Sequence, residues 1–172
     1  MSKPTARYVL LGLVSVITVL LDQATKLQIT QSMRLHESIP VVPDFFSITY
    51  IRNPGAAFGI LASSSSGFRL AFFGVTSILA LVLLSTIFVR LKPTHWIGQL
   101  SVAAVFGGAI GNLLDRVRFG EVIDFLDIYL GAYHWPAFNV ADAAISAGVC
   151  FLVYHLAFEK HEAEPAPQQL KN

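Results

Sequence analysis

The chain has 172 residues, of which 54% are hydrophobic and only 13% are charged, and its formal net charge is +1. Soluble domains carry about 25% charged residues, so this composition excludes a domain covered by solvated side chains and predicts one integral membrane domain over residues 1–172. The charge balance excludes a basic nucleic-acid-binding chain, and the single cysteine, Cys150, excludes an internal disulfide.

Stretches long and apolar enough to cross a bilayer, which takes about 20 helical residues, occur four times. They cover residues 8–27, 70–89, 97–114 and 135–158. Backbone polar groups in lipid must bond within their own segment, so we expect each stretch to be a helix. The predicted fold class is an all-α, four-helix transmembrane bundle with both termini on one side of the membrane.

The first span resembles a secretory signal peptide, because Lys3 and Arg7 precede a long uncharged run. However, no small-residue cleavage site follows it, and three more spans do, so an uncleaved anchor is favoured. At the other end, residues 159–172 include Pro165, Pro167 and paired glutamines, and we expect a disordered tail there.

A polar insert, residues 31–67, separates the first and second spans. Residues 46–51 alternate between apolar and polar side chains, which predicts a half-buried strand. Pro40 and Pro43 keep the sheet short or place it at an edge, and residues 53–55 (Asn-Pro-Gly) are a turn signal. We therefore expect a small extracytoplasmic β-sheet on the membrane surface.

The side of the membrane follows from the acidic residues. Lysines and arginines are divided six against six between the two sides and give no orientation. The acids gather on the side opposite the termini: Asp22, Glu37, Asp44, Asp115, Glu121, Asp124, Asp127 and Asp142. Basic residues that pair with these acids are poor markers of topology, and leaving them out favours cytoplasmic termini.

Several polar groups meet on that same side. Asp22 and Lys26 are four residues apart and share a helix face, either as an anchor at the membrane boundary or as a functional pair. A seam of Gly107, Gly108 and Gly111 lets a neighbouring helix approach closely, so its expected role is packing.

The end of the third span and the start of the fourth also carry polar pairs on shared faces. Asn112 and Arg116 lie one turn apart, and we expect Arg116 to form an internal ion pair with Asp115 instead of extending to the interface. In the fourth span Asn139 and Asp142 are three residues apart and point the same way.

Two acids stand out by their surroundings. Asp142 lies roughly 10 Å inside the expected fourth helix, where an ionisable group indicates function, although a hydrogen-bonded core acid is the alternative. Asp124 lies within the apolar run 122–126, which predicts a protein-lined cleft. The five histidines are scattered and no HExxH motif occurs, so neither a metal nor a cofactor is expected.

At these positions the sequence resembles the lipoprotein signal peptidases, or type II signal peptidases, in five blocks that occur in order within residues 8–158. The blocks are DQATK (22–26), RNPGAAF (52–58), GGAIGNLLDR (107–116), VIDF (122–125) and FNVAD (138–142). The resemblance implies an aspartyl protease of the bacterial inner membrane, with cytoplasmic termini and an active site near the extracytoplasmic face.

The resemblance also implies the substrate and the site. The substrates are prolipoproteins with a diacylglyceryl-modified cysteine, cut just before that cysteine. The catalytic aspartates fall on Asp124 and Asp142. The supporting positions fall on Asp22, Lys26, Asn53, Gly55, Asn112, Arg116, Asn139 and Ala141. Membrane lipid is the other partner, nucleic acid is not one, and the chain is expected to act as a monomer.

Two adjacent carboxyl groups explain how such a site can cleave a peptide, because they share one proton. The ionised group accepts a proton from the attacking water, and the protonated group donates to the carbonyl oxygen. Asp115 competes with Asp124 for its place in the pair. The alternative function is a small proton-coupled transporter with Asp142, Asp124 and Arg116 as a relay, although no inverted repeat is visible. A non-catalytic helical subunit leaves the acids unexplained.

Overall fold

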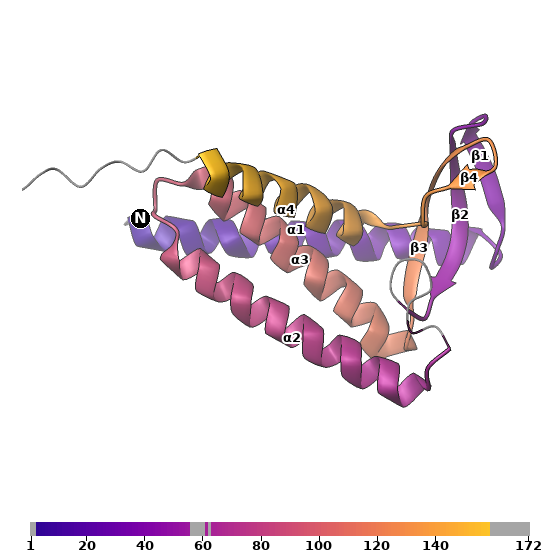
Figure 1. Cartoon of the computed structure of the whole chain (residues 1–172), viewed down its shortest axis with the longest axis horizontal. Helices are drawn as coiled ribbons and strands as arrows, with labels where there is room; N and C mark the ends of the chain where they lie inside the picture. The colour runs from indigo at the N-terminus through magenta and orange to yellow at the C-terminus, as the bar shows by residue number, and fades with distance from the viewer. Residues whose placement is uncertain (1–2, 56–60, 62, 159–172) are drawn as a thin grey trace, which may run out of the picture.

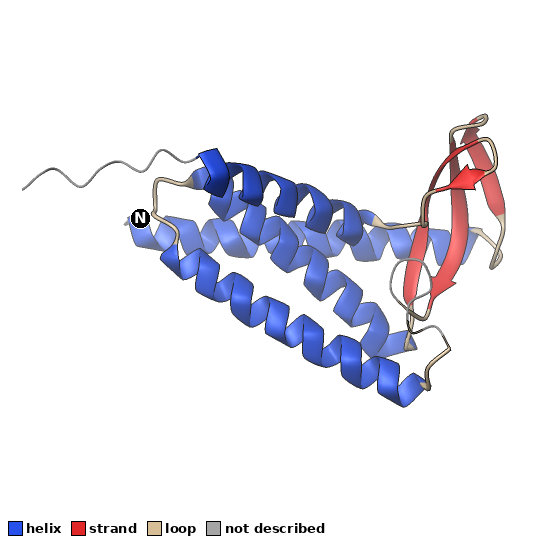
Figure 2. Ribbon diagram, in the orientation of Figure 1, coloured by secondary structure: helices blue, strands red, loops and turns tan. Residues whose placement is uncertain are grey.

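The computed structural model describes residues 3–55, 61 and 63–158, which form four helices and four strands. These are α1 (Lys3–Ser32), β1 (Ser38–Val42), β2 (Phe46–Asn53), α2 (Ser66–Arg90), α3 (Trp96–Phe119), β3 (Val122–Leu130), β4 (Tyr133–His134) and α4 (Val140–Phe158). The sheet stands across one end of the helices, and the N-terminus lies at the other end (Figures 1 and 2). The predicted tail, 159–172, lies outside the described residues.

All four helices within the described residues are long and apolar enough to cross a membrane, which confirms the predicted fold class. In α3, 56% of the most apolar stretch is buried, against 11–17% in α1, α2 and α4. On α2, Ile78, Leu79 and Leu83 each expose more than half of their surface. Such an apolar exterior is stable in lipid, which replaces the missing protein contacts. The helix α3 is therefore the centre of the bundle.

The glycine seam of α3 allows this central packing. A Cβ on Gly107 would lie 2.7 Å from the backbone oxygen of Ser15 in α1, and one on Gly108 would lie 2.5 Å from the backbone oxygen of Ala141 in α4. Both distances are shorter than any real Cβ contact. The two helices therefore approach α3 from two sides only because these positions lack side chains.

We expect Gly108→Ala to destabilise the bundle by about 1–3 kcal/mol, because the added methyl group must push back the first turn of α4. The measurement is the thermal unfolding midpoint in detergent. Gly12→Ala is the matched control, since a Cβ there meets nothing within 4 Å. Equal midpoints for the two variants would contradict the packing role.

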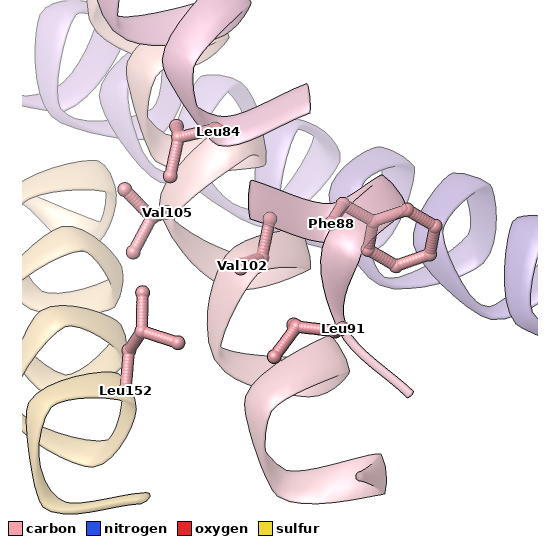
Figure 3. Packing of buried hydrophobic residues seen from close by; sticks show 6 residues of the cluster. All are labelled: Leu84, Phe88, Leu91, Val102, Val105 and Leu152. Atoms are coloured by element: carbon pink, nitrogen blue, oxygen red, sulfur yellow. The ribbon is translucent and has the colours of Figure 1, made fainter. Parts of the chain in front are cut away.

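Apolar packing near the termini holds the helices together at that end. Its buried side chains come from α2, α3 and α4 and contact one another in one cluster (Figure 3). They are Leu84, Phe88, Leu91, Val102, Val105 and Leu152. At the same end the Arg7 guanidinium donates to the backbone oxygens of Phe88 and Leu91, where α2 ends. The buried acids Asp115, Asp124 and Asp127 lie instead towards the end that carries the sheet.

The sheet has the order β1-β2-β3-β4 with antiparallel neighbours. The predicted strand over 46–51 is confirmed as part of β2, and Pro40 lies in the edge strand β1, where a missing N–H costs least. The sequence did not predict β3 or β4. A second apolar cluster joins Ile29 of α1 and Met33, just after α1, to Ile123 of β3. The helix α1 therefore continues past its predicted end at residue 27 and supports the sheet.

The predicted start of the fourth span at Trp135 is wrong, because α4 begins at Val140. The preceding residues run along β3 instead. The Trp135 N–H donates to the Ile128 oxygen at 2.8 Å, and Phe138 and Leu126 exchange backbone hydrogen bonds. Pro136 favours this extended backbone, since the residue before a proline is disfavoured in a helix.

Candidate active site

Asp124 and Asp142 line the same cleft, although they are 18 residues apart in the sequence. The cleft has a volume of about 720 Å³ and lies between β2, β3, α3 and the start of α4. Asp124 is contributed by β3 and Asp142 by the first turn of α4. The strand and the helix meet there because Phe138, two residues before α4 begins, is hydrogen-bonded to β3.

Asn139 connects the two carboxyl groups. Its side-chain Nδ2 donates to Asp124 Oδ1 at 2.8 Å, and its Oδ1 accepts from the backbone N–H of Asp142 at 2.9 Å. The Asn139 N–H donates in return to Asp142 Oδ2 at 3.3 Å. This reciprocal pair is a capping box at the N-terminus of α4, with aspartate in the place of the usual glutamate. The interactions that begin the helix therefore also position Asp142.

Asn112, on α3, holds the other oxygen of Asp142. Its Nδ2 donates to Asp142 Oδ1 at 2.7 Å, while its Oδ1 accepts from Lys26 Nζ at 3.0 Å and from Asn139 Nδ2 at 3.1 Å. With two donors fixed on its oxygen, the amide has one orientation, with its NH₂ group towards Asp142.

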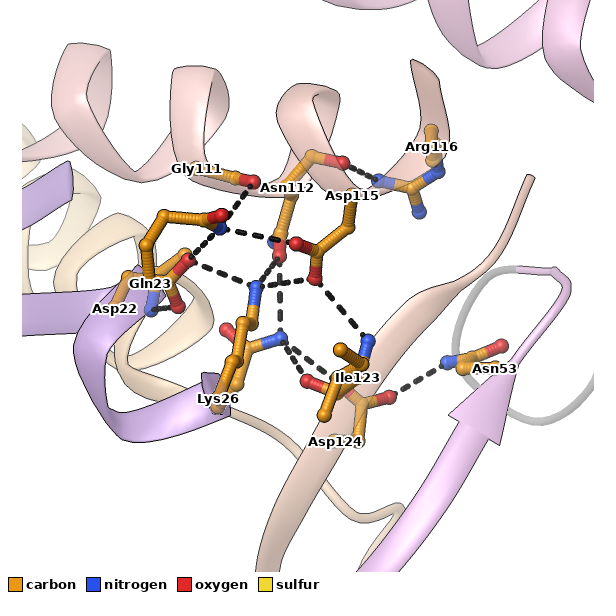
Figure 4. A network of polar contacts seen from close by, with 12 residues as sticks. Asp22, Gln23, Lys26, Asn53, Gly111, Asn112, Asp115, Arg116, Ile123 and Asp124 are labelled. Carbon is orange, nitrogen blue, oxygen red and sulfur yellow. Dashed lines mark hydrogen bonds and ion pairs between the residues drawn. The ribbon is translucent and has the colours of Figure 1, made fainter. Parts of the chain in front are cut away.

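Behind the cleft lies a buried ion-pair cluster (Figure 4). Lys26 Nζ lies 2.8 Å from Asp22 Oδ2 and 2.8 Å from Asp115 Oδ2, and none of the three side chains exposes more than 2% of its surface. The predicted pairing of Asp22 with Lys26 is confirmed. The predicted pairing of Asp115 with Arg116 is wrong: the partner of Asp115 is Lys26. A buried charge needs such partners, so the cluster is a rigid support.

This cluster is connected to α4. Asp22 Oδ1 accepts from the backbone N–H of Ala141 at 2.9 Å, which satisfies a donor in the first turn of the helix. Asp115 Oδ2 also accepts from the Ile123 N–H at 3.2 Å, next to Asp124 in β3. The same buried charges thus hold the backbone beside both aspartates of the cleft.

The opposite wall of the cleft is formed by the end of β2 and by Arg116. Asn53 Nδ2 donates to Asp124 Oδ2 at 2.9 Å, and Asn53 Oδ1 accepts from the Gly55 N–H at 3.0 Å, which closes the predicted turn. Arg116 Nη2 approaches the Gly55 oxygen at 3.4 Å, with its guanidinium over the Phe73 ring. The surface insert therefore reaches Asp124.

The position of Asp124 changes its acidity. Burial and then the nearby charge of Asp142 raise the pKa of Asp124 to about 7, against the hydrogen bonds from Asn53 and Asn139 and the charge of Lys26. The Asp124 carboxyl can therefore hold a proton near neutral pH.

All ten predicted site residues converge on this region. Six line the cleft, namely Asn53, Gly55, Asn112, Arg116, Asp124 and Asp142. The other four, Asp22, Lys26, Asn139 and Ala141, are buried behind it. Asp115 does not line the cleft, so it does not compete with Asp124 for a place beside Asp142.

Two parts of this site were not predicted from the sequence: Gln23 and the segment 135–138. Gln23 Nε2 lies 3.0 Å from Asp115 Oδ1 and 3.2 Å from Asp22 Oδ2, and its only sequence signal is its position beside Asp22. The segment Trp135–Phe138 lines the cleft, but it was assigned to the fourth helix.

Known proteins are similar to this chain over most of its length. The family model described as Signal peptidase (SPase) II matches residues 14–158. A lipoprotein signal peptidase of Desulforapulum autotrophicum is 51% identical over 156 residues, which cover 91% of this chain and 96% of the relative. One of Geobacter sulfurreducens is 48% identical and covers 95% of this chain and 99% of the relative.

A solved structure is also similar. It is described as a bacterial membrane enzyme determined by the in meso method at 2.3 Å resolution. It superposes with a TM-score of 0.79 and 34% sequence identity, covering 91% of this chain and 92% of that chain. With the family model matching most of its length, the chain belongs to the signal peptidase II family.

Proposed function

We propose that the chain is a membrane aspartic endopeptidase that removes the signal peptide from prolipoproteins, cutting just before a diacylglyceryl-modified cysteine. The family and the names of the relatives support a peptidase with prolipoprotein substrates. The observation that carries the aspartic mechanism is the pair Asp124 and Asp142, lining one cleft and bridged by Asn139. These relatives give no support to the transporter alternative.

In this mechanism the two carboxyl groups divide the proton transfers. The ionised carboxylate accepts a proton as the water oxygen attacks the scissile carbonyl carbon, and the protonated carboxyl donates its proton to the carbonyl oxygen. The tetrahedral intermediate then collapses, the C–N bond breaks, and the leaving nitrogen takes a proton from the pair. Asn53, Asn112 and Asn139 hold the carboxyl oxygens in place, and Gly55 and Arg116 contact the substrate in the cleft.

The substrate reaches the site from within the membrane. The cleft extends along α4 past Ala143 to Ser146, about one turn deeper into the membrane than Asp142. These small side chains leave room for an apolar segment that lies in the bilayer. A precursor anchored by its own signal segment and lipid can therefore enter the cleft sideways, and the two molecules meet within the membrane lipid.

We place the termini in the cytoplasm and the cleft near the extracytoplasmic face of the bacterial inner membrane. The sheet and the cleft lie at the end of the bundle opposite the N-terminus (Figure 1). Arg90, at the end of α2, and Lys92 lie on the terminal side, in keeping with positive charges on cytoplasmic loops. Because one chain supplies both aspartates and their amide partners, we propose that it acts as a monomer.

A cleavage assay tests this function. The purified chain in lipid vesicles is mixed with a precursor that carries a diacylglyceryl cysteine, and the products are identified by mass. We expect a cut just before that cysteine, and no cut in a matched precursor with serine at that position. An intact lipid-modified precursor would reject the peptidase, and proton flux across the vesicle membrane would then favour the transporter.

The raised pKa of Asp124 predicts the pH dependence of the reaction. The pair is active with one proton, and Asp124 loses its proton as the pH rises through about 7. We therefore expect kcat/KM to fall as the pH rises above about 7, measured with the lipid-modified precursor. A profile that stays flat from about pH 6 to about pH 9 would be inconsistent with a shared proton.

A further inference from the structure

Asp127 and His134 form a hydrogen-bonded pair that takes no part in the chemistry described above. His134 Nδ1 lies 2.9 Å from Asp127 Oδ1 and 3.1 Å from Asp127 Oδ2. The Asp127 side chain is buried, whereas about half of the His134 side chain is exposed. The His134 ring stacks on the Tyr129 ring, with centroids 4.6 Å apart and an interplanar angle of 15°. This side chain of β4 is thus fixed from two sides.

The pair is anchored in the middle of the sheet. Asp127 lies in β3 opposite Ser47 of β2, and its Oδ2 also accepts from the Thr49 hydroxyl at 3.4 Å. The Tyr129 hydroxyl lies 3.1 Å from Ser47 Oγ. Both contacts of His134 therefore rest on strands paired along their length, which makes β2 and β3 a rigid base for it.

The chain that follows His134 forms part of the cleft. Trp135, Pro136, Ala137 and Phe138 all line it. This short wall is held at its start by the bond from the Trp135 N–H to Ile128 and by the contacts of His134. At its end, the Phe138 oxygen accepts from the N–H groups of Phe125 and Leu126. Between these ends Pro136 has no N–H to donate to the sheet.

Because the wall is attached to β3 through Phe138, a change at His134 does not displace the aspartates. Asn139 and Asp142 are held by their own capping box and by Asn112, none of which involves His134. Loosening the start of the wall therefore changes the shape of the cleft and leaves the carboxyl groups in place.

We propose that Asp127 and His134 are positioning residues that hold the cleft wall Trp135–Phe138 in the shape that binds the substrate. The pair acts on substrate affinity and leaves the chemical step unchanged. This inference rests on the peptidase function proposed above.

The test compares Asp127→Ala, His134→Ala and the double variant in the cleavage assay. We expect KM to rise about fivefold in each single variant. Loss of a fully buried charge-assisted hydrogen bond would raise KM roughly tenfold or more, but the effect is smaller here because His134 is half exposed. The kcat should stay within about twofold. The double variant should match the singles, since the two residues act as one unit. Asp127→Asn keeps an oxygen for the imidazole and should restore most of the affinity.

Matched controls separate positioning from general stability. Glu37→Ala removes an exposed side-chain hydrogen bond beside the sheet, the one from the Arg34 N–H, and leaves the pair and its supports intact, so its KM should be unchanged. Asp44→Asn makes the same acid-to-amide change at an exposed turn with a φ of 59°, which asparagine tolerates, and should be silent.

A second measurement does not depend on turnover. The chain has two tryptophans, so in a Trp96→Phe background the fluorescence anisotropy of Trp135 reports on the wall alone. We expect this anisotropy to fall in both single variants. If Asp127→Ala does not fold, His134→Ala carries the test because its side chain is half exposed.

An unchanged KM and anisotropy in the folded His134→Ala variant would overturn the inference, and so would a loss of kcat alone. Neither result would affect the proposed function, which fails instead if the parent chain does not cut the lipid-modified precursor.

Discussion

Replacing Asp124 or Asp142 with asparagine should lower kcat by about 10²–10⁴-fold, the usual contribution of a positioned acid or base. Each substitution keeps the shape of the side chain but removes the group that carries or accepts the shared proton. The double variant should be little worse than either single variant, because residues that act as a unit lose activity non-additively. The measurement is single-turnover cleavage of the lipid-modified precursor by folded, membrane-inserted protein.

Asp115→Asn is the informative control for this experiment. Asp115 is buried like Asp124, but it contacts Lys26, Gln23 and the Ile123 N–H and does not line the cleft. We expect it to lower the unfolding midpoint and to leave a measurable rate in the molecules that remain folded. If Asp115→Asn were inactive with an unchanged midpoint while Asp124→Asn turned over normally, the catalytic pair would have to be reassigned.

The second large effect is expected for Asn53→Ala. This change removes the donor that holds Asp124 Oδ2 and the acceptor that closes the turn at Gly55. A hydrogen bond to a charged group contributes about 1.5–3 kcal/mol, so kcat/KM should fall about 10- to 100-fold. The Asn53 hydrogen bond lowers the pKa of Asp124, so its loss should also shift the alkaline fall in activity to higher pH.

Ser64→Ala is the comparison for Asn53→Ala, because Ser64 lies in the lead into α2 and contacts Leu61 and Arg69 through its backbone. It should leave both the rate and the pH profile unchanged. Equal kinetics for the two variants, or an alkaline limb that stays in place in Asn53→Ala, would show that the end of β2 does not act on Asp124.

The sequence predicted the spans and the convergence of the site because both depend on properties that a single segment carries. Apolar length defines a span, and a span brings its two ends to opposite faces of the membrane. The end of α1, the end of α3 and the start of α4 therefore had to meet, with Asp22, Asn112 and Asp142 among them. Asn53, a supporting position that the resemblance implies, likewise lies 2.9 Å from Asp124.

The predictions failed where the outcome depends on a partner far away in the sequence. Val122, Ile123, Asp124 and Phe125 are all buried, so β3 lacks the alternation that identifies a half-exposed strand. Neighbouring residues in a helix do not face each other, so Asp115 cannot turn towards Lys26 and also pair with Arg116. Only the docking of α1 against α3 decides which cation Asp115 meets.

The position of Lys26 has a consequence for how the protein is made. Asp22 and Lys26 lie four residues apart in the same helix, so they can neutralise each other before any other helix is present. Asp115 meets Lys26 only when α1 and α3 dock. During synthesis the part of α1 that holds Asp22 and Lys26 can therefore enter the bilayer with these two charges neutralised, before α3 docks and adds Asp115 to the cluster.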